Sequence, residues 1–169
     1  SSTYGQKFIG RPVSDDDIAS VEDELNVQLP PEYKELIKQQ NGGMVNRCIF
    51  PCGYKTGWSD DHIEITDILG IDKNKPSIFG TKYLQSEWGY PEGYLNIANT
   101  PVSGHLEVFL DYREAGPNAD PPVVSIDQED NYKVTLLAES FGDFIRNLIT
   151  KDEFENLVRH SRKNISESE

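Results

Sequence analysis

The feature of this sequence that most constrains its fold is a short segment carrying a helix start signal at one end and a helix stop signal at the other. It reads Leu29-Pro30-Pro31-Glu32-Tyr33-Lys34-Glu35-Leu36-Ile37-Lys38-Gln39-Gln40-Asn41, followed by Gly42 and Gly43. Proline suits the first helical turn because it lacks an N–H and its φ is already helical, and glycine after a helix adopts the left-handed conformation that ends it. The segment is therefore predicted to be a short helix bounded at both ends.

A second helix is predicted just upstream of this segment. Ser14 offers a side chain that can cap free backbone N–H groups, and Ile18, Val21 and Leu25 recur on one face of a helix. The chain is therefore expected to begin with two amphipathic helices joined at Leu29-Pro30.

The rest of the chain reads mainly as strands. Apolar or alternating runs predict strands over residues 45–50, 62–66, 94–98, 105–111, 123–127 and 133–138, and a short helix within residues 76–88. Ser140 is placed to cap a final core helix, and the short polar connection over 128–131 suits a hairpin. We expect an α+β fold: a single domain with a mostly antiparallel sheet of about five or six strands, packed against the N-terminal helix pair and a C-terminal helix.

Several later segments follow the helix pair in a recognisable order. They are Ile68-Leu69-Gly70, Pro91-Glu92-Gly93-Tyr94-Leu95-Asn96-Ile97-Ala98, Leu110-Asp111 and Ala138-Glu139-Ser140-Phe141-Gly142-Asp143-Phe144-Ile145. With Leu-Pro-x-x-Tyr-Lys-x-Leu and Asn-Gly-Gly, this order resembles the SUKH superfamily, specifically the Smi/Knr group related to a fungal regulator of cell-wall synthesis. The resemblance covers residues 14–149 as the SUKH-like domain, preceded by an N-terminal arm over 1–13. Residues 150–169 lie outside it, and their apolar spacing predicts a helical extension with a frayed end. Bacterial members are typically cytoplasmic immunity proteins that bind and neutralise a polymorphic toxin, often a nuclease.

The charge of the chain limits its partners. Acidic residues outnumber basic ones 29 to 16, which gives a formal net charge of -13. Such a chain repels phosphate backbones and attracts basic surfaces, so neither nucleic acid nor an anionic membrane is expected as a partner. No apolar run approaches the ~20 residues needed to cross a bilayer, and one extended strand would hold Cys48 and Cys52 too far apart for a strain-free disulfide. A cytoplasmic location is therefore expected.

The sequence contains no complete motif for metal-dependent catalysis, calcium binding or phosphate binding. His62-Ile63-Glu64 and His105-Leu106-Glu107 each read H-x-E, but no P-C-x-x-C follows, and alternation on strands explains both as solvent-facing polar residues around a buried one. Asp127, Glu129 and Asn131 only begin a calcium loop, and no phosphate-binding glycine motif occurs. No metal, no cofactor and no enzymatic activity are predicted.

The sequence instead favours recognition of another protein. Loop aromatics near clustered carboxylates can supply the anchors and the electrostatic steering of such an interface. We expect the loops over 53–67 and 112–120 to bind a basic, nuclease-type toxin domain, with Trp88 and Tyr54 as further candidate anchors. The partner-binding residues predicted are Trp58, Asp60, Asp61, Glu64, Tyr90, Asp111, Tyr112 and Glu114.

Two alternatives stay open on the sequence alone. The same domain could serve as a regulatory or scaffolding interaction module outside immunity, as the fungal relative suggests. An unrecognised hydrolase is the third possibility, which metal content or activity screening would test.

Overall fold

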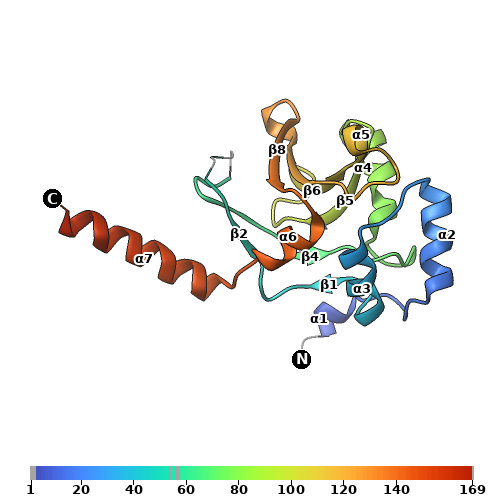
Figure 1. Ribbon diagram of the computed structural model, residues 1–169, viewed down its shortest axis with the longest axis horizontal. Helices are drawn as coiled ribbons and strands as arrows, with labels where there is room; N and C mark the ends of the chain where they lie inside the picture. Colours follow the sequence, from blue (N-terminus) through green and yellow to red (C-terminus); the bar gives the residue numbers. More distant parts are fainter. Residues whose placement is uncertain (1–2, 54, 56–57, 169) are drawn as a thin grey trace.

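The computed structural model describes residues 3–53, 55 and 58–168 (Figure 1). The helices are α1 (Thr3–Gln6), α2 (Asp15–Leu25), α3 (Pro31–Gln39), α4 (Thr81–Trp88), α5 (Tyr112–Ala115), α6 (Phe141–Arg146) and α7 (Lys151–Glu167), with 3-10 helices η1 (Ile78–Gly80) and η2 (Gln128–Asp130). The strands are β1 (Gly43–Met44), β2 (Ile49–Pro51), β3 (His62–Glu64), β4 (Asp67–Ile68), β5 (Tyr94–Asn99), β6 (Leu106–Asp111), β7 (Val123–Asp127) and β8 (Lys133–Ala138). Tyr54, a candidate anchor from the sequence, lies outside the described residues.

One six-stranded sheet organises the molecule. Its order is β1-β4-β5-β6-β7-β8, and every neighbouring pair is antiparallel, while β2 and β3 form a separate hairpin. Two-residue β1 lies at one edge of the sheet and six-residue β8 at the other. The predicted α+β class with an antiparallel sheet is confirmed.

The N-terminal helix pair forms as the sequence predicts. The Ser14 side chain accepts a hydrogen bond from Asp17 N–H, and the Asp17 side chain accepts one from Ser14 N–H, which closes a capping box at the start of α2. Pro31 occupies the first turn of α3. After α3, Gly42 has φ +78°, a conformation that costs glycine little and that turns the chain into β1.

Two strand predictions were wrong in their boundaries. Residues 45–50 were expected to be one strand, but β1 ends before them and β2 takes up only their end, in the other sheet. Residues 62–66 were also expected to be one strand, but β3 ends at Glu64. Ile65 N–H donates to Cys48 O, beside β2, whereas Thr66 N–H, just before β4, donates to Asn99 O of the large sheet. Because the chain changes sheets at this point, a continuous apolar pattern belongs to two different ladders.

The large sheet is covered on both faces, which produces two apolar clusters. The larger cluster packs α2, α3 and α6 against the sheet through residues such as Val108 and Leu110, with Tyr33, Phe141 and Phe144 fully buried. The smaller cluster contains Phe109 and Trp88, at the end of α4. Since side chains alternate along a strand, these clusters occupy opposite faces of β6.

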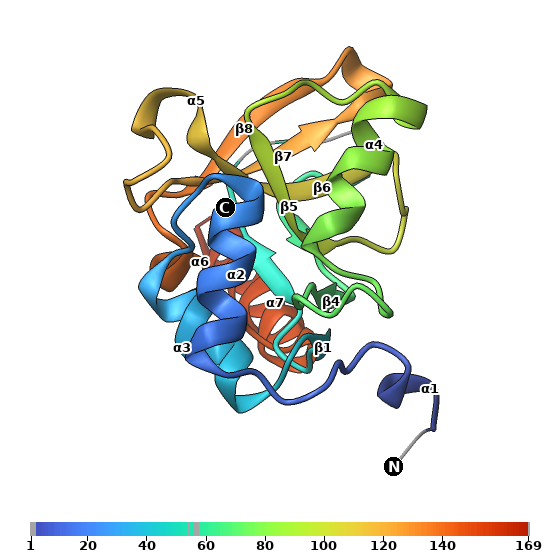
Figure 2. The ribbon, with the colours of Figure 1, turned by 90° about the vertical axis from the view of Figure 1, so that its right-hand side faces the viewer.

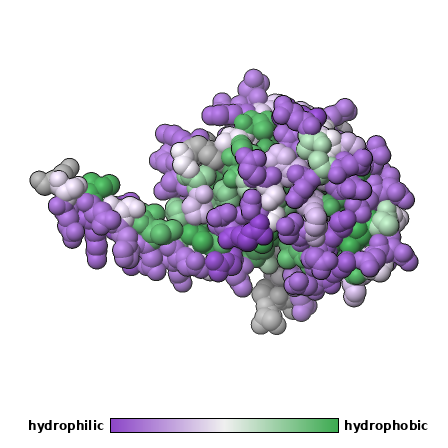
Figure 3. Space-filling model, viewed as in Figure 1, coloured by the Kyte–Doolittle hydropathy of each residue, from purple (hydrophilic) through white to green (hydrophobic). Residues whose placement is uncertain are grey.

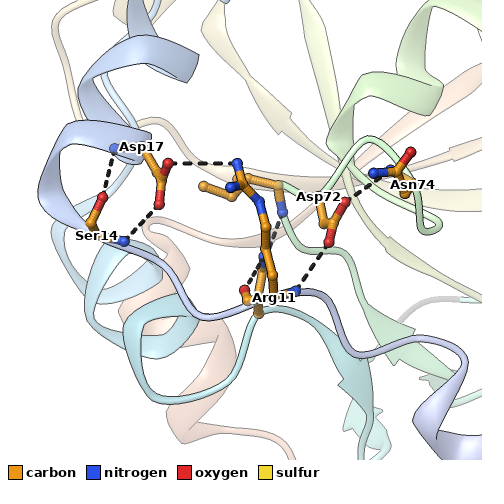
Figure 4. Close-up of polar contacts among 7 residues, drawn as sticks. Arg11, Ser14, Asp17, Asp72 and Asn74 are labelled. Atoms are coloured by element: carbon orange, nitrogen blue, oxygen red, sulfur yellow. Dashed lines mark hydrogen bonds and ion pairs between the residues drawn. The ribbon is translucent and has the colours of Figure 1, made fainter.

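The N-terminal arm is bonded to the domain near the start of α2 (Figure 4). Arg11 N–H donates to Asp72 Oδ2 at 3.0 Å, and Asn41 Nδ2 donates to Arg11 O at 2.9 Å. Asp72 Oδ1 accepts from Asn74 N–H at 2.9 Å, and these backbone N–H groups lower the pKa of Asp72. The arm is thus fixed through its main chain.

Helix α7 extends away from the domain (Figure 1). The sequence indicated one or two helical turns before a polar end from Ser161 onward, but α7 is one 17-residue helix that continues to Glu167. Thr150 caps its start by accepting from Glu153 N–H at 3.1 Å. No residue of α7 is buried.

Candidate partner-binding surface

The predicted partner-binding residues do not form one surface. Trp58, Asp60, Asp61 and Glu64 belong to the β2–β3 hairpin, and Asp111, Tyr112 and Glu114 lie at the end of β6 and in α5. The Trp58 ring lies 6.0 Å from that of His105, which directly precedes β6, whereas Asp111 ends this strand. At about 3.3 Å per residue, the length of β6 separates the two groups by about 20 Å. Figure 1 shows the hairpin and α5 apart on either side of β8.

The hairpin group is exposed and acidic. Trp58 is 47% exposed. Asp60 lies 3.5 Å from Lys55 Nζ, with both side chains 80% exposed, and Asp61 Oδ1 lies 2.7 Å from His62 Nδ1. Glu64 differs from these acids because its carboxylate lies 2.8 Å from Lys151 Nζ of α7. Asp60 and Asp61 are therefore the acids of this group that a partner can reach most easily.

The second group has mainly structural contacts. Asp111 is buried, accepts from Arg113 N–H at 3.0 Å to begin α5, and binds Arg113 Nε and Nη2, each at 3.1 Å. Tyr112 is half-buried, and its hydroxyl donates to Gln28 O at 2.7 Å. Glu114 is exposed. Only Glu114 of this group offers a carboxylate at the surface.

Tyr90 lies in the core. It is 3% exposed, its ring packs on Phe109 with centroids 5.2 Å apart, and its hydroxyl donates to Gly104 O. Burial raises the pKa of Tyr90, since the charged phenolate is disfavoured there. Tyr90 therefore stabilises the connection between β5 and β6 from inside the core and is not available to a partner.

The structure brings both tryptophans together around His105. The Trp88 ring meets the His105 ring edge-on with centroids 5.2 Å apart, and the Trp58 ring lies on the same imidazole. His105 Nδ1 lies 2.6 Å from Glu129 Oε1. We call this region the tryptophan surface; it comprises Trp58, Asp60, Asp61, Trp88, His105 and Glu129.

Local geometry fixes the position of Trp88. It ends α4, and Gly89, with φ +76°, reverses the chain behind it. Gly104 has φ +82°, and a Cβ there would lie 2.9 Å from the Trp88 ring, so only glycine allows this close approach. Tyr132 donates its hydroxyl hydrogen bond to Trp88 O. The position of Trp88 is thus fixed by the chain reversal at Gly89 and by contacts with Gly104 and Tyr132, which are distant from it in sequence.

Sequence reasoning missed the roles of His105, Glu129 and Glu107. Glu107 was expected to face solvent, but it is 1% exposed, because α4 covers the face of β6 that alternation assigns to solvent. Alternation shows which residues share a face, and a second apolar cluster was needed to show that this face is also covered. The apolar residue Phe109, on the same face as Glu107, was the available signal.

The tryptophan surface combines an exposed indole with exposed carboxylates. Among the residues that the structure describes, no group of three or more His, Cys, Asp or Glu side chains is placed to hold a metal ion. In the same part of the chain, no helix has the length and apolar character to traverse a bilayer. An exposed indole beside carboxylates can anchor a protein partner and steer a basic one.

Comparison with known proteins gives one family match. The family model described as SMI1 / KNR4 family (SUKH-1) matches residues 12–147. This span contains every strand of the sheet and the helices from α2 to α6, and it ends before α7 begins. No curated protein matches the chain.

Proposed function

Because the chain belongs to the SMI1 / KNR4 family (SUKH-1), we propose that it is an immunity protein, which binds and neutralises a cognate toxin domain, and that it performs no catalysis. The family is generally one of non-catalytic immunity proteins. The proposal places the protein in the cytoplasm, where such a toxin would act on the cell that makes it. The most fitting toxin is a basic nuclease.

The tryptophan surface is the observation that carries this proposal. Binding energy at protein interfaces concentrates in a few aromatic and arginine side chains surrounded by residues that exclude water. Trp58 is 47% exposed on a hairpin loop, and the Trp58 and Trp88 rings both contact the ring of His105. An anchor that is already ordered before binding loses little conformational entropy when the partner arrives.

Charge supports the choice of a basic partner. The chain has a formal net charge of -13, and Asp60 and Asp61 are exposed next to Trp58. A nuclease must present positive charge to the phosphates of its substrate, so an acidic inhibitor associates with it rapidly and competes for the same surface. Association should therefore slow as salt concentration rises.

The test begins with co-expression. The gene would be expressed together with the toxin domain encoded next to it, and survival and co-purification would be scored. Trp58→Ala is expected to weaken toxin binding at least about 30-fold, as for an interface hot spot of about 2 kcal/mol. Tyr4→Ala is the matched control, because Tyr4 is an aromatic residue 57% exposed on α1, away from this surface.

Charge reversal tests the acidic part of the surface. Asp60→Lys with Asp61→Lys should slow association and reduce its salt dependence, whereas Asp23→Lys with Glu35→Lys changes the net charge equally at exposed positions of α2 and α3. Equal effects of the two pairs would mean that net charge matters and the surface does not. Survival that does not depend on this protein would instead reject immunity and favour a regulatory or scaffolding role.

A further inference from the structure

A pocket of about 410 Å³ lies beside the tryptophan surface. It is on the face of the sheet that α4 covers, and Figure 2 shows α4 against the strands β5 and β6. Its walls come from α4, β5 and β6, and Trp88 belongs to both the pocket and the tryptophan surface. The residues that matter most for its chemistry are Tyr83, Leu84, Trp88, Asn96, Asn99 and Glu107. We call it the Glu107 pocket.

Glu107 contributes a buried carboxylate whose hydrogen bonding is incomplete. The residue is 1% exposed. Its Oε1 accepts a hydrogen bond from Gly104 N–H at 2.7 Å. Its Oε2 is buried and has no hydrogen-bond partner among the residues that the structure describes. A buried acceptor without a donor costs free energy, so this oxygen marks a position where a donor would bind favourably.

The surroundings of Glu107 contain more negative than positive charge. Burial and, to a smaller extent, the nearby carboxyl of Asp67 raise the pKa of Glu107 to about 8, although the N–H groups of Gly104 and Thr100 and the amide of Asn96 act in the opposite direction. Asp67 is itself buried, and its pKa is also raised by burial. In the part of the chain that the structure describes, no positively charged side chain pairs with this carboxyl to stabilise its ionised form.

We propose that the Glu107 pocket receives a basic side chain of the protein partner, an alkylammonium or guanidinium donor on an apolar stem, with Glu107 Oε2 as its acceptor. The partner being a protein rests on the proposed function. Tyr83, Leu84 and Trp88 offer the apolar and aromatic surface on which methylene groups and cations pack. A basic donor fits better than a neutral one, because its positive charge compensates the carboxylate that burial otherwise disfavours.

The proposal has a signature in pH. A cation that pairs with ionised Glu107 must displace the proton that the carboxyl holds below pH 8. Binding should therefore strengthen up to about tenfold per pH unit between pH 6 and 7, and level off above pH 8. The titratable groups that interact with Glu107 are Asp67 and Tyr90, and the Asp67 carboxylate adds to the attraction when ionised.

The experiment uses small probes and the full chain. Nα-acetyl-lysine amide and Nα-acetyl-arginine amide supply the two basic groups, and Nα-acetyl-norleucine amide supplies an apolar stem without charge. Binding is followed by NMR at the Trp88 indole N–H and the Gly104 amide, at pH 6, 7 and 8. Saturable shifts are expected with one or both basic probes, which also shows whether ammonium or guanidinium is preferred, and none with the norleucine probe.

Two variants identify the acceptor. Glu107→Gln keeps the size of the side chain and removes its charge, so the shifts and their pH dependence should disappear. Glu22→Gln is the matched control, since Glu22 is a half-buried carboxyl lining a different groove, between α2 and α3. Should Glu107→Gln fail to fold, the pH dependence measured on the unaltered chain still decides the matter.

Three results would overturn the proposal: no saturable shift with either basic probe, equal shifts with norleucine, or binding that is independent of pH between 6 and 8. These measurements require no toxin. Their failure would leave the immunity proposal standing, and failure to neutralise a toxin would leave probe binding unchanged.

Discussion

The domain body and helix α7 are stabilised in different ways. Helix α6, at the end of the body, is only six residues long, but Phe141 and Phe144 are both 0% exposed. The 17-residue α7 has no buried residue, and Leu157 and Ile165 are 55% and 62% exposed. Figure 3 shows hydrophobic residues along α7 that the body does not cover. The shorter helix therefore depends on packing, and the longer one on local hydrogen bonds, caps and propensity.

Among the residues that the structure describes, the first turns of α7 make the ring contact and the ion pairs with the body. The Phe154 ring lies 4.6 Å from the His62 ring, Lys151 Nζ lies 2.8 Å from a Glu64 oxygen, and Arg47 lies 3.5 Å from Glu153. The family match at residues 12–147 also ends before α7. The part of the chain that matches the family thus contains the packed sheet and helices, whereas α7 lies outside it and has no buried residue.

The largest effect that would test this comparison comes from a pair of truncated side chains. Phe144→Ala removes a fully buried ring that stacks on Phe50, with centroids 5.2 Å apart, and should cost about 3–5 kcal/mol in the free energy of unfolding. Leu157→Ala, in α7, should change it by less than about 0.5 kcal/mol. Urea denaturation measures both, and similar losses would mean that the two regions are equally packed.

The second prediction concerns Glu107, because only the body encloses an acid of this kind. Its pKa in the folded chain, about 8, lies above the ordinary 4.5, so the unfolded chain binds fewer protons between these values. The stabilisation from the protonated form is complete below pH 4.5 and is lost as pH rises to 8, by at most about 1.4 kcal/mol per pH unit. Glu107→Gln should remove this dependence in urea titrations at pH 5, 6, 7 and 8; parallel curves for the two proteins would contradict it.

A smaller effect is expected from deleting residues 151–169. The deletion removes one ring contact and two largely exposed ion pairs, so the free energy of unfolding should fall by about 1 kcal/mol or less. In the intact chain, amides in the second half of α7 should exchange with solvent faster than those of β6. A loss as large as that of Phe144→Ala would show that α7 unfolds cooperatively with the sheet.

The smallest effect sharpens the contact between the two regions. Lys151→Ala breaks the ion pair between Lys151 and Glu64, whose side chains are 65% and 31% exposed, respectively. The free energy of unfolding should fall by only a few tenths of a kcal/mol. The effect should vanish in about 1 M salt, where charges are screened beyond about 3 Å. A salt-independent loss above about 1 kcal/mol would indicate that the methylene stem of Lys151, and not its charge, holds α7 to the body.

Much of the fold could be predicted because its signals are local. Pro31 begins α3, and Ser14 and Ser140 cap α2 and α6 through bonds to residues three positions away. The end of α3 differs from the expectation, because extended Gln40 follows the helix and the left-handed Gly42 comes two residues later. Local signals failed at Thr66, where the chain leaves one sheet for the other, because strand pairing depends on partners far along the sequence.

The candidate site was harder to predict for the same reason. Trp58 and Asp61 are exposed on a loop, as the sequence predicts. Tyr90, in contrast, is buried, and the Asp111 carboxylate binds Arg113. The neighbourhood of Trp58 and Trp88 exists only because the hairpin loop and the end of α4 both meet His105. These contacts join residues that are far apart in the sequence, so no local pattern predicts them.

Strand β8 has a consequence for how the protein should be handled. It is six residues long, lies at the edge of the sheet, and exposes Val134 and Leu136 at 36% and 51%. An open edge of this kind is a template on which another chain can add a strand and begin to aggregate. The net charge of -13 keeps copies apart only over the Debye length, about 10 Å at 0.1 M salt. Concentrated stocks should therefore remain clear longer in buffers of low ionic strength.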